Sequence, residues 1–138
     1  MTIAIHSTSW GFSPDWIAYC ERMGIKYKTV NCYDSNIIEQ IADCDALLWN
    51  HHHTHAKDVL FAKQLLFAIW HSGKRVFPDF HSGWHFDDKV GQKYLLEAIK
   101  APTALTWVFY DKNVALNWIK TVEFPIVFKL RGGAGSTN

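Results

Sequence analysis

The sequence predicts an α/β fold in which helices cover the faces of a parallel sheet. Three observations support this prediction. Short apolar segments alternate with amphipathic segments along residues 1–80, the apolar segments have strand length, and turn-forming residues separate them. Regular alternation of this kind is typical of βαβ units with right-handed crossovers. Residues 1–80 are therefore expected to form a Rossmann-like domain.

The predicted strands and helices follow one another in strict order. The strands are residues 3–5, 27–32, 46–49 and 75–78. The first helix starts at Ser13 with Pro14 in its first turn and ends at Gly24, a residue type that commonly closes helices. A short helix follows Asp34. Residues 57–71 form the strongest helical pattern, because apolar residues recur on one face at Ala62, Leu65, Leu66 and Ile69.

A second region, residues 81–138, has a different pattern. Asp87 and Asp88 start a helix, and Asp111 caps another. The β-branched and aromatic segments 106–110 and 126–130 are predicted strands. A glycine-rich tail follows. This order of elements predicts a partial α+β domain after the parallel sheet.

Composition limits the functional classes. The chain has 138 residues, 49% apolar and 20% charged, so a folded core is expected. A formal charge of +1 provides no basic field for nucleic acid. No apolar run approaches the ~20 residues of a membrane span, and no signal peptide is recognisable. The three cysteines form no Cys-x-x-Cys pair, which favours a reduced, cytoplasmic protein.

Histidines cluster after the third predicted strand. His51, His52, His53 and His55 stand where parallel sheets place their ligands, and His6, Ser7 and Trp10 follow the first strand towards the same edge. We take His6, Ser7, Trp10, His51 and His53 as candidate substrate contacts. Ordinary loop packing and a zinc site are the alternatives, although the spacing supplies few metal ligands.

The glycine-rich tail is a candidate phosphate-binding loop. Lys129 ends an apolar strand, and glycines after it would let backbone N–H groups approach a phosphate closely. The segment matches neither of the two common nucleotide-binding patterns. From these residues alone, a flexible hairpin or linker is equally compatible.

Residues 88–136 resemble the opening of an ATP-grasp domain. Members typically have an Asp-Lys pair at a helix start, a Pro-Thr segment before a strand, a Pro-(Val/Ile)-Val-x-Lys strand and a glycine-rich loop. The matching elements, in the same order, are Asp88-Lys89, Leu95-Leu96, Pro102-Thr103, Phe109, Ala115, residues 124–129 and residues 132–136. The family usually carries a Rossmann-like pre-ATP-grasp domain upstream, which residues 1–80 would supply. Residues 81–138 would then be a linker helix and the start of the small nucleotide lobe.

The resemblance implies a nucleotide site. The matching lysines, Lys89 and Lys129, contact ATP phosphates in relatives, and a glycine loop closes over them. Here that loop comprises Gly132, Gly133, Ala134, Gly135, Ser136 and Thr137. The family's ribose contact, adenine hinge and Mg²⁺ ligands would follow Asn138. We therefore expect the front part of an enzyme that uses ATP and Mg²⁺, and we expect residues 1–138 alone to be inactive and to hold no cofactor.

The activity implied is that of a carboxylate–amine or carboxylate–thiol ligase acting through an acyl-phosphate. The expected substrate is a small-molecule or saccharide-linked carboxylate. The sequence of the glycine loop resembles that of uncharacterised bacterial ATP-grasp ligases, a resemblance that implies a role in surface-polysaccharide biosynthesis. An alternative is a non-catalytic Rossmann-like module that binds a sugar nucleotide or a protein partner. We expect residues 103–138 either to fray or to be ordered by a second copy of the chain, as in a homodimer.

Overall fold

The computed structural model describes residues 1–133, and it divides the chain into two compact units. The first unit is Met1–Trp84, and the second begins at His85. The boundary lies slightly beyond the predicted position at residue 80.

The first unit contains the predicted four-stranded, all-parallel sheet. Its strands are β1 (Thr2–His6), β2 (Lys26–Val30), β3 (Ala46–Leu48) and β4 (Arg75–Phe77), arranged in the order β2-β1-β3-β4. Ile3 lies beside Tyr27 on one side and Ala46 on the other, and Ala46 lies beside Arg75. The prediction of a parallel sheet is therefore confirmed.

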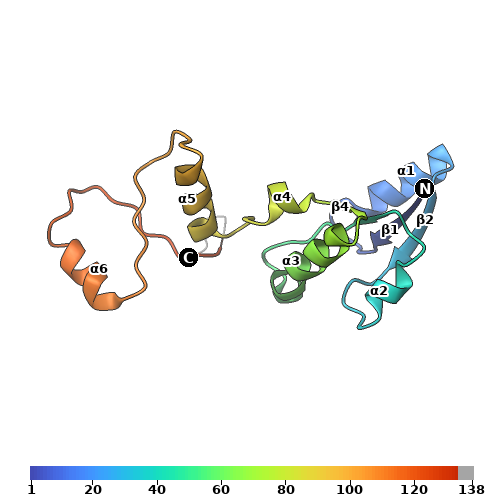
Figure 1. Ribbon diagram of the computed structural model, residues 1–138, viewed down its shortest axis with the longest axis horizontal. Coiled ribbons are helices and arrows are strands. Elements are labelled where there is room, and N and C mark those ends of the chain that lie inside the picture. The colour runs from blue at the N-terminus through green and yellow to red at the C-terminus, as the bar shows by residue number, and fades with distance from the viewer. Residues whose placement is uncertain (134–138) are drawn as a thin grey trace. The chain divides into compact units, whose positions relative to one another are not determined.

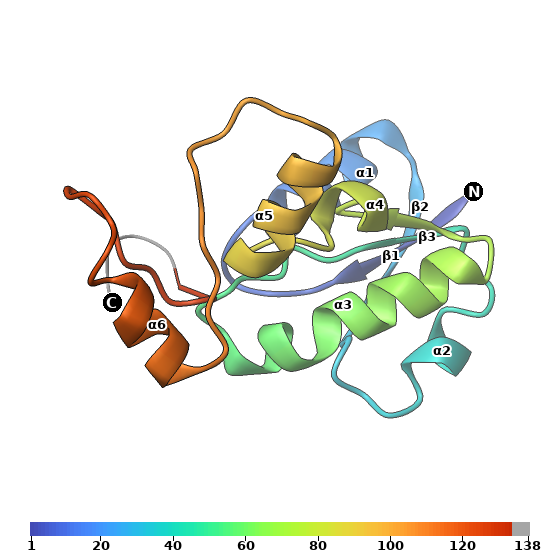
Figure 2. The same cartoon turned by 60° about the vertical axis from the view of Figure 1, so that its left-hand side comes forward.

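Helices cover both faces of this sheet (Figures 1 and 2). They are α1 (Ser13–Met23), α2 (Ile37–Gln40), α3 (Ala56–His71) and the short α4 (Phe80–Gly83). Helix α1 lies on one side of the sheet, and α2 and α3 lie on the other. This distribution follows from right-handed crossovers, because the chain leaves β1 in one direction and returns across it to β3.

The main core lies between the sheet and helices α2 and α3. The strands contribute Ala4, Val30 and Leu47, and α3 contributes Ala62, Leu66 and Ile69, which repeat at helical spacing. Trp49, just after β3, is completely buried. The α3 residues are those that the apolar pattern selected, apart from Leu65, which is only partly buried and packs against the cluster.

Local sequence explains the ends of the helices. Gly24 adopts a left-handed conformation with φ of 64°, and its N–H reaches the last turn of α1. Asp79 caps α4 by accepting a hydrogen bond from the Ser82 N–H. Helix α4 was not predicted, because its four residues are too few for a periodic signal in the sequence.

The second unit contains helices but no described strand. They are α5 (Lys89–Ala98) and α6 (Lys112–Trp118), capped by the predicted residues Asp88 and Asp111. The predicted strands at 106–110 and 126–130 are wrong for the described residues, where both segments lack sheet pairing. A strand needs a neighbour to exchange backbone hydrogen bonds, and propensity alone does not supply one. Residues 85–133 therefore do not confirm the expected α+β small lobe.

No helix among residues 1–133 is both long enough and apolar enough to cross a membrane.

Candidate functional site

In the first unit, the carboxyl edge of the sheet between β1 and β3 is the topological switch point. The chain leaves β1 towards β2 and enters β3 from the other direction, so the loops after these two strands diverge. Open parallel sheets bind ligands in this position. The loop after β1 carries Ser7 and Trp10, and the loop after β3 carries the histidines.

Hydrogen bonds fix the loop that joins β1 to α1. The Thr8 N–H donates to the Ser13 hydroxyl at 3.0 Å, and the Thr8 hydroxyl lies 2.7 Å from the same oxygen. Asn50 reaches across from the end of β3, where its Oδ1 accepts from the Phe12 N–H at 2.8 Å. A Cβ at Gly11 would lie only 2.0 Å from that Oδ1, so a larger residue there would force the Asn50 side chain to move. The loop therefore has one defined course towards α1.

A buried histidine lies at the end of β1. His6 is 3% exposed, and its Nδ1 accepts a hydrogen bond from the Cys32 N–H at 2.9 Å. The ring makes an edge contact with Tyr33, with centroids 5.0 Å apart, and lies 5.3 Å from the Trp49 ring. His6 thus connects the ends of neighbouring strands and does not face solvent.

A buried carboxylate completes the polar cluster. Asp58, in the first turn of α3, is 1% exposed. It accepts from the Tyr33 hydroxyl at 2.5 Å and from the His52 N–H at 2.7 Å. Among the described residues, the indole N–H of Trp49 is buried without a hydrogen-bond partner. Asp58 therefore anchors the histidine loop to α3.

Burial also sets the charge of this cluster. It lowers the pKa of His6, although Asp58 opposes the shift, and it lowers the pKa of His51. It raises the pKa of the Cys32 thiol and, together with the hydrogen bond to Asp58, that of Tyr33. Both histidines are therefore mainly neutral at pH 7, so they offer hydrogen bonds rather than positive charge.

The remaining histidines lie against aromatic rings. Trp10 stacks on His55, with centroids 4.6 Å apart and planes at 15°, and it meets the His52 ring edge-on. His53 lies beside His52, with centroids 4.2 Å apart. No group of three or more His, Cys, Asp or Glu residues within 1–133 is arranged to hold a metal ion. The structure thus brings Trp10 to the histidine loop, as expected for one shared edge.

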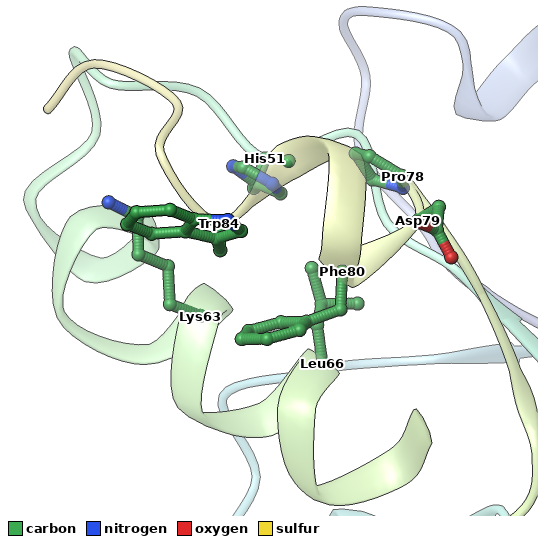
Figure 3. A pocket seen from close by; sticks show the side chains of 8 residues that line it. His51, Lys63, Leu66, Pro78, Asp79, Phe80 and Trp84 are labelled. Carbon is green, nitrogen blue, oxygen red and sulfur yellow. The ribbon is translucent and has the colours of Figure 1, made fainter. Parts of the chain in front are cut away.

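A small hollow opens on the same unit near the end of β4 (Figure 3). Its cavity volume is about 10 Å³, and its lining residues are His51, Lys63, Leu66, Pro78, Asp79, Phe80, Gly83 and Trp84. The Lys63 side chain extends alongside the Trp84 ring, with His51 close by. A hollow of this size has room for about one water molecule, far less than the pockets of about 300–1,000 Å³ that hold drug-sized ligands.

In the second unit, the pair Asp88-Lys89 contacts the start of the glycine segment, defined as the glycine loop that begins at Gly132. The Lys89 N–H donates to the Arg131 carbonyl at 2.9 Å, and the Lys89 ammonium donates to the Gly133 carbonyl. Asp88 caps α5 and also pairs with the Arg131 guanidinium. Two motifs far apart in the sequence therefore lie together at the amino end of a helix.

The other predicted phosphate contacts are placed differently or are not described. Lys129 is exposed, and no hydrogen bond or ion pair within residues 1–133 joins it to Lys89 or Gly133. A Cβ at Gly132 would lie 3.3 Å from an Asp87 oxygen. Ala134, Gly135, Ser136 and Thr137 lie outside the described residues.

Sequence reasoning missed several residues of these sites. Asp58 shares the buried face of α3 with Ala62 and Leu66, and an acid on an apolar face is a readable signal. Tyr33 and Asn50 gave no such signal. Asp87 was identified only as part of a helix start, although its carboxylate reaches Gly133.

Comparison with known proteins adds no relative, since no family model, curated protein or solved structure matches the chain.

Proposed function

We propose that the chain is the N-terminal part of an ATP-dependent ligase of the ATP-grasp type. The parent reaction transfers the γ-phosphoryl group of ATP to a carboxylate oxygen, which yields ADP and an acyl-phosphate. An amine or thiol then attacks the acyl carbon and releases phosphate. Magnesium would neutralise the transferring group when bound.

The observation that carries the proposal is the contact between Lys89 and Gly133. These residues are 44 positions apart, yet the lysine side chain reaches the backbone of the glycine segment. An ammonium, a glycine backbone and the amino end of the ten-residue helix α5 are the groups that bind phosphates in many proteins. The resemblance assigns phosphate contacts to the same two residues.

The first unit is proposed to hold the carboxylate substrate, whether a small molecule or a saccharide-linked group. Ser7 and Trp10 lie in the loop after β1, and His51 and His53 lie in the loop after β3. His6 is buried behind them, so we assign it a positioning role through Tyr33. The stacked Trp10–His55 pair supplies a flat surface of the kind on which sugar rings pack.

The proposal is tested by ATP binding and turnover in the longest natural chain that contains residues 1–138. Lys89→Ala and Lys129→Ala each remove a charge-assisted phosphate contact, so affinity or turnover should fall by about 10- to 150-fold. Calorimetry and release of inorganic phosphate are the measurements.

Lys112→Ala is the matched control. Lys112 begins α6 after the capping residue Asp111, which repeats the local arrangement at α5. Within the described residues it forms no hydrogen bond or ion pair with the glycine segment, so its replacement should leave ATP binding unchanged. If the Lys89 and Lys129 variants both bind ATP like the wild type, the ligase proposal is overturned and a non-catalytic binding module becomes the better reading.

A further inference from the structure

Asp87 contacts the two groups to which the proposed function assigns phosphate binding, the Gly133 N–H and the Lys89 ammonium. Both of its carboxylate oxygens lie 2.9 Å from the Gly133 backbone nitrogen, and one lies 3.7 Å from the Lys89 ammonium. The carboxylate is an anion flanked by a backbone N–H and a lysine. These are the donors that bind phosphate oxygens at glycine loops.

The backbone at Asp87 is held in an uncommon conformation. Its φ is 54°, in the left-handed region that residues other than glycine, asparagine and aspartate seldom adopt. Such conformations persist where the surrounding contacts maintain them, and they concentrate at binding sites and switches. Here the contacts are those to Gly133 and Lys89, and the Asp87 side chain is only 18% exposed.

The contacts of Asp87 exclude a second anion. The Gly133 backbone has one N–H group, which cannot donate fully to both the carboxylate and a phosphate. The charge of Asp87 also offsets that of Lys89, and Asp88 offsets Arg131 in the same way. While Asp87 remains in place, the site has no net positive charge to attract a nucleotide.

We infer that Asp87 is an internal competitor for the phosphate site formed by Lys89 and the Gly133 N–H, and that an incoming phosphoryl group must displace it. The inference rests on the proposed function for the identity of the ligand. It assigns Asp87 a gating role, in which the carboxylate holds Gly133 beside the start of α5 until a nucleotide or pyrophosphate displaces it.

Asp87→Asn tests the inference. Asparagine tolerates the left-handed conformation and is nearly the same size, but it carries no charge. If the displaced state is populated at about 10–30% in the wild type, weakening the competitor should tighten binding of ATP and of inorganic pyrophosphate by roughly 3- to 10-fold. The Gly133 amide resonance should shift in the variant without ligand, because its acceptor changes.

Glu97→Gln is the matched control, since it removes one acidic charge from the other end of the same helix. It should leave both affinities unchanged, which excludes a general effect of net charge. The gain in Asp87→Asn should vanish when Lys89→Ala is added.

The outcomes separate the two proposals. Suppose that Lys89→Ala binds ATP more weakly, and that Asp87→Asn binds both ligands no more tightly than the wild type. The ligase proposal is then supported, and the inference that Asp87 competes with phosphate is overturned. If Asp87→Asn binds pyrophosphate more tightly but no variant binds ATP, Asp87 is supported as a competitor for phosphate, and the proposal that the ligand is a nucleotide is overturned. Binding of neither ligand by any variant overturns both.

Discussion

His6 shows how a single residue couples the site to the fold. Its imidazole is enclosed by Tyr33 and Trp49, and its Nδ1 accepts from the Cys32 N–H. In this position the ring must stay neutral to keep its acceptor. Protonation of Nδ1 would place its N–H against the Cys32 N–H, so that two hydrogen-bond donors would face each other in a poorly solvated site.

The stability of the protein should therefore fall at acidic pH. Burial lowers the pKa of folded His6 below its ordinary value of 6.5. Between those two pKa values the unfolded chain binds a proton that the folded chain does not bind. The free energy of unfolding should thus decrease as the pH falls below about 6.5, by at most about 1.4 kcal/mol per pH unit for one proton.

The contribution of His6 can be isolated by urea denaturation at pH 7.5 and pH 5.5. His6→Asn offers Oδ1 in place of Nδ1 and does not titrate, so it should flatten the decrease. Burial lowers the pKa of His51 as well, so part of the decrease in stability should remain in His6→Asn. If the free energy of unfolding fell equally between pH 7.5 and pH 5.5 in the wild type and in His6→Asn, the contribution assigned to His6 would be contradicted.

At the scale of elements, glycines stand at both ends of helix α1. Gly11 precedes the helix with φ of 69°, and Gly24 ends it with φ of 64°. The two positions share a backbone conformation but differ in their surroundings. A Cβ at Gly24 would meet nothing within 4 Å, whereas one at Gly11 would collide with Asn50.

Alanine at the two glycines should separate backbone strain from steric collision. Gly24→Ala should lower the free energy of unfolding by about 1–2 kcal/mol, the usual cost of a left-handed conformation with a Cβ. Gly11→Ala should cost more, about 3 kcal/mol or above, because it also displaces Asn50 from the Phe12 N–H. Chemical denaturation of both variants measures the difference, and equal losses would show that Asn50 moves away freely.

At the scale of the whole molecule, the two units differ in how much they bury. The first unit has a continuous core under α2 and α3, and that core holds its strands. In the described part of the second unit, Gly91 is the single buried residue. Large apolar side chains are open to solvent there, including Leu105, Tyr110 and Val127. Cooperative stability is therefore expected to reside in the first unit.

Hydrogen exchange should show this difference directly. Strands β1 and β3 each pair with a neighbouring strand on either side. Their hydrogen-bonded amides should therefore exchange only when a large part of the unit unfolds. Segments 106–110 and 126–130 have no backbone hydrogen bonds among the described contacts and should exchange within seconds. Slow exchange that depends on protein concentration would instead mean that a second copy pairs with them, which was the expected homodimer contact.

Local sequence patterns were sufficient for the elements of the first unit except the four-residue helix α4. Strand and helix positions there followed from apolar periodicity and from Gly24, and the caps Asp88 and Asp111 marked the helix starts of the second unit in the same way. These signals act within a few residues of each other. Parallel pairing followed from the alternation of strands with helices. The predictions of strands at 106–110 and 126–130 were wrong because β-propensity describes how well a residue fits a sheet, not whether a neighbouring strand is present.

The sequence by itself determined that this chain contains a parallel α/β unit, and it identified the histidine loop, Lys89 and the glycine segment as candidates for function. The tertiary structure alone decided the strand order, the burial of His6 and Asp58, and the contact of Asp87 with Gly133. Helix and strand signals depend on neighbours within a few positions, whereas these contacts join residues tens of positions apart. Only the packed backbone determines which of those distant groups meet.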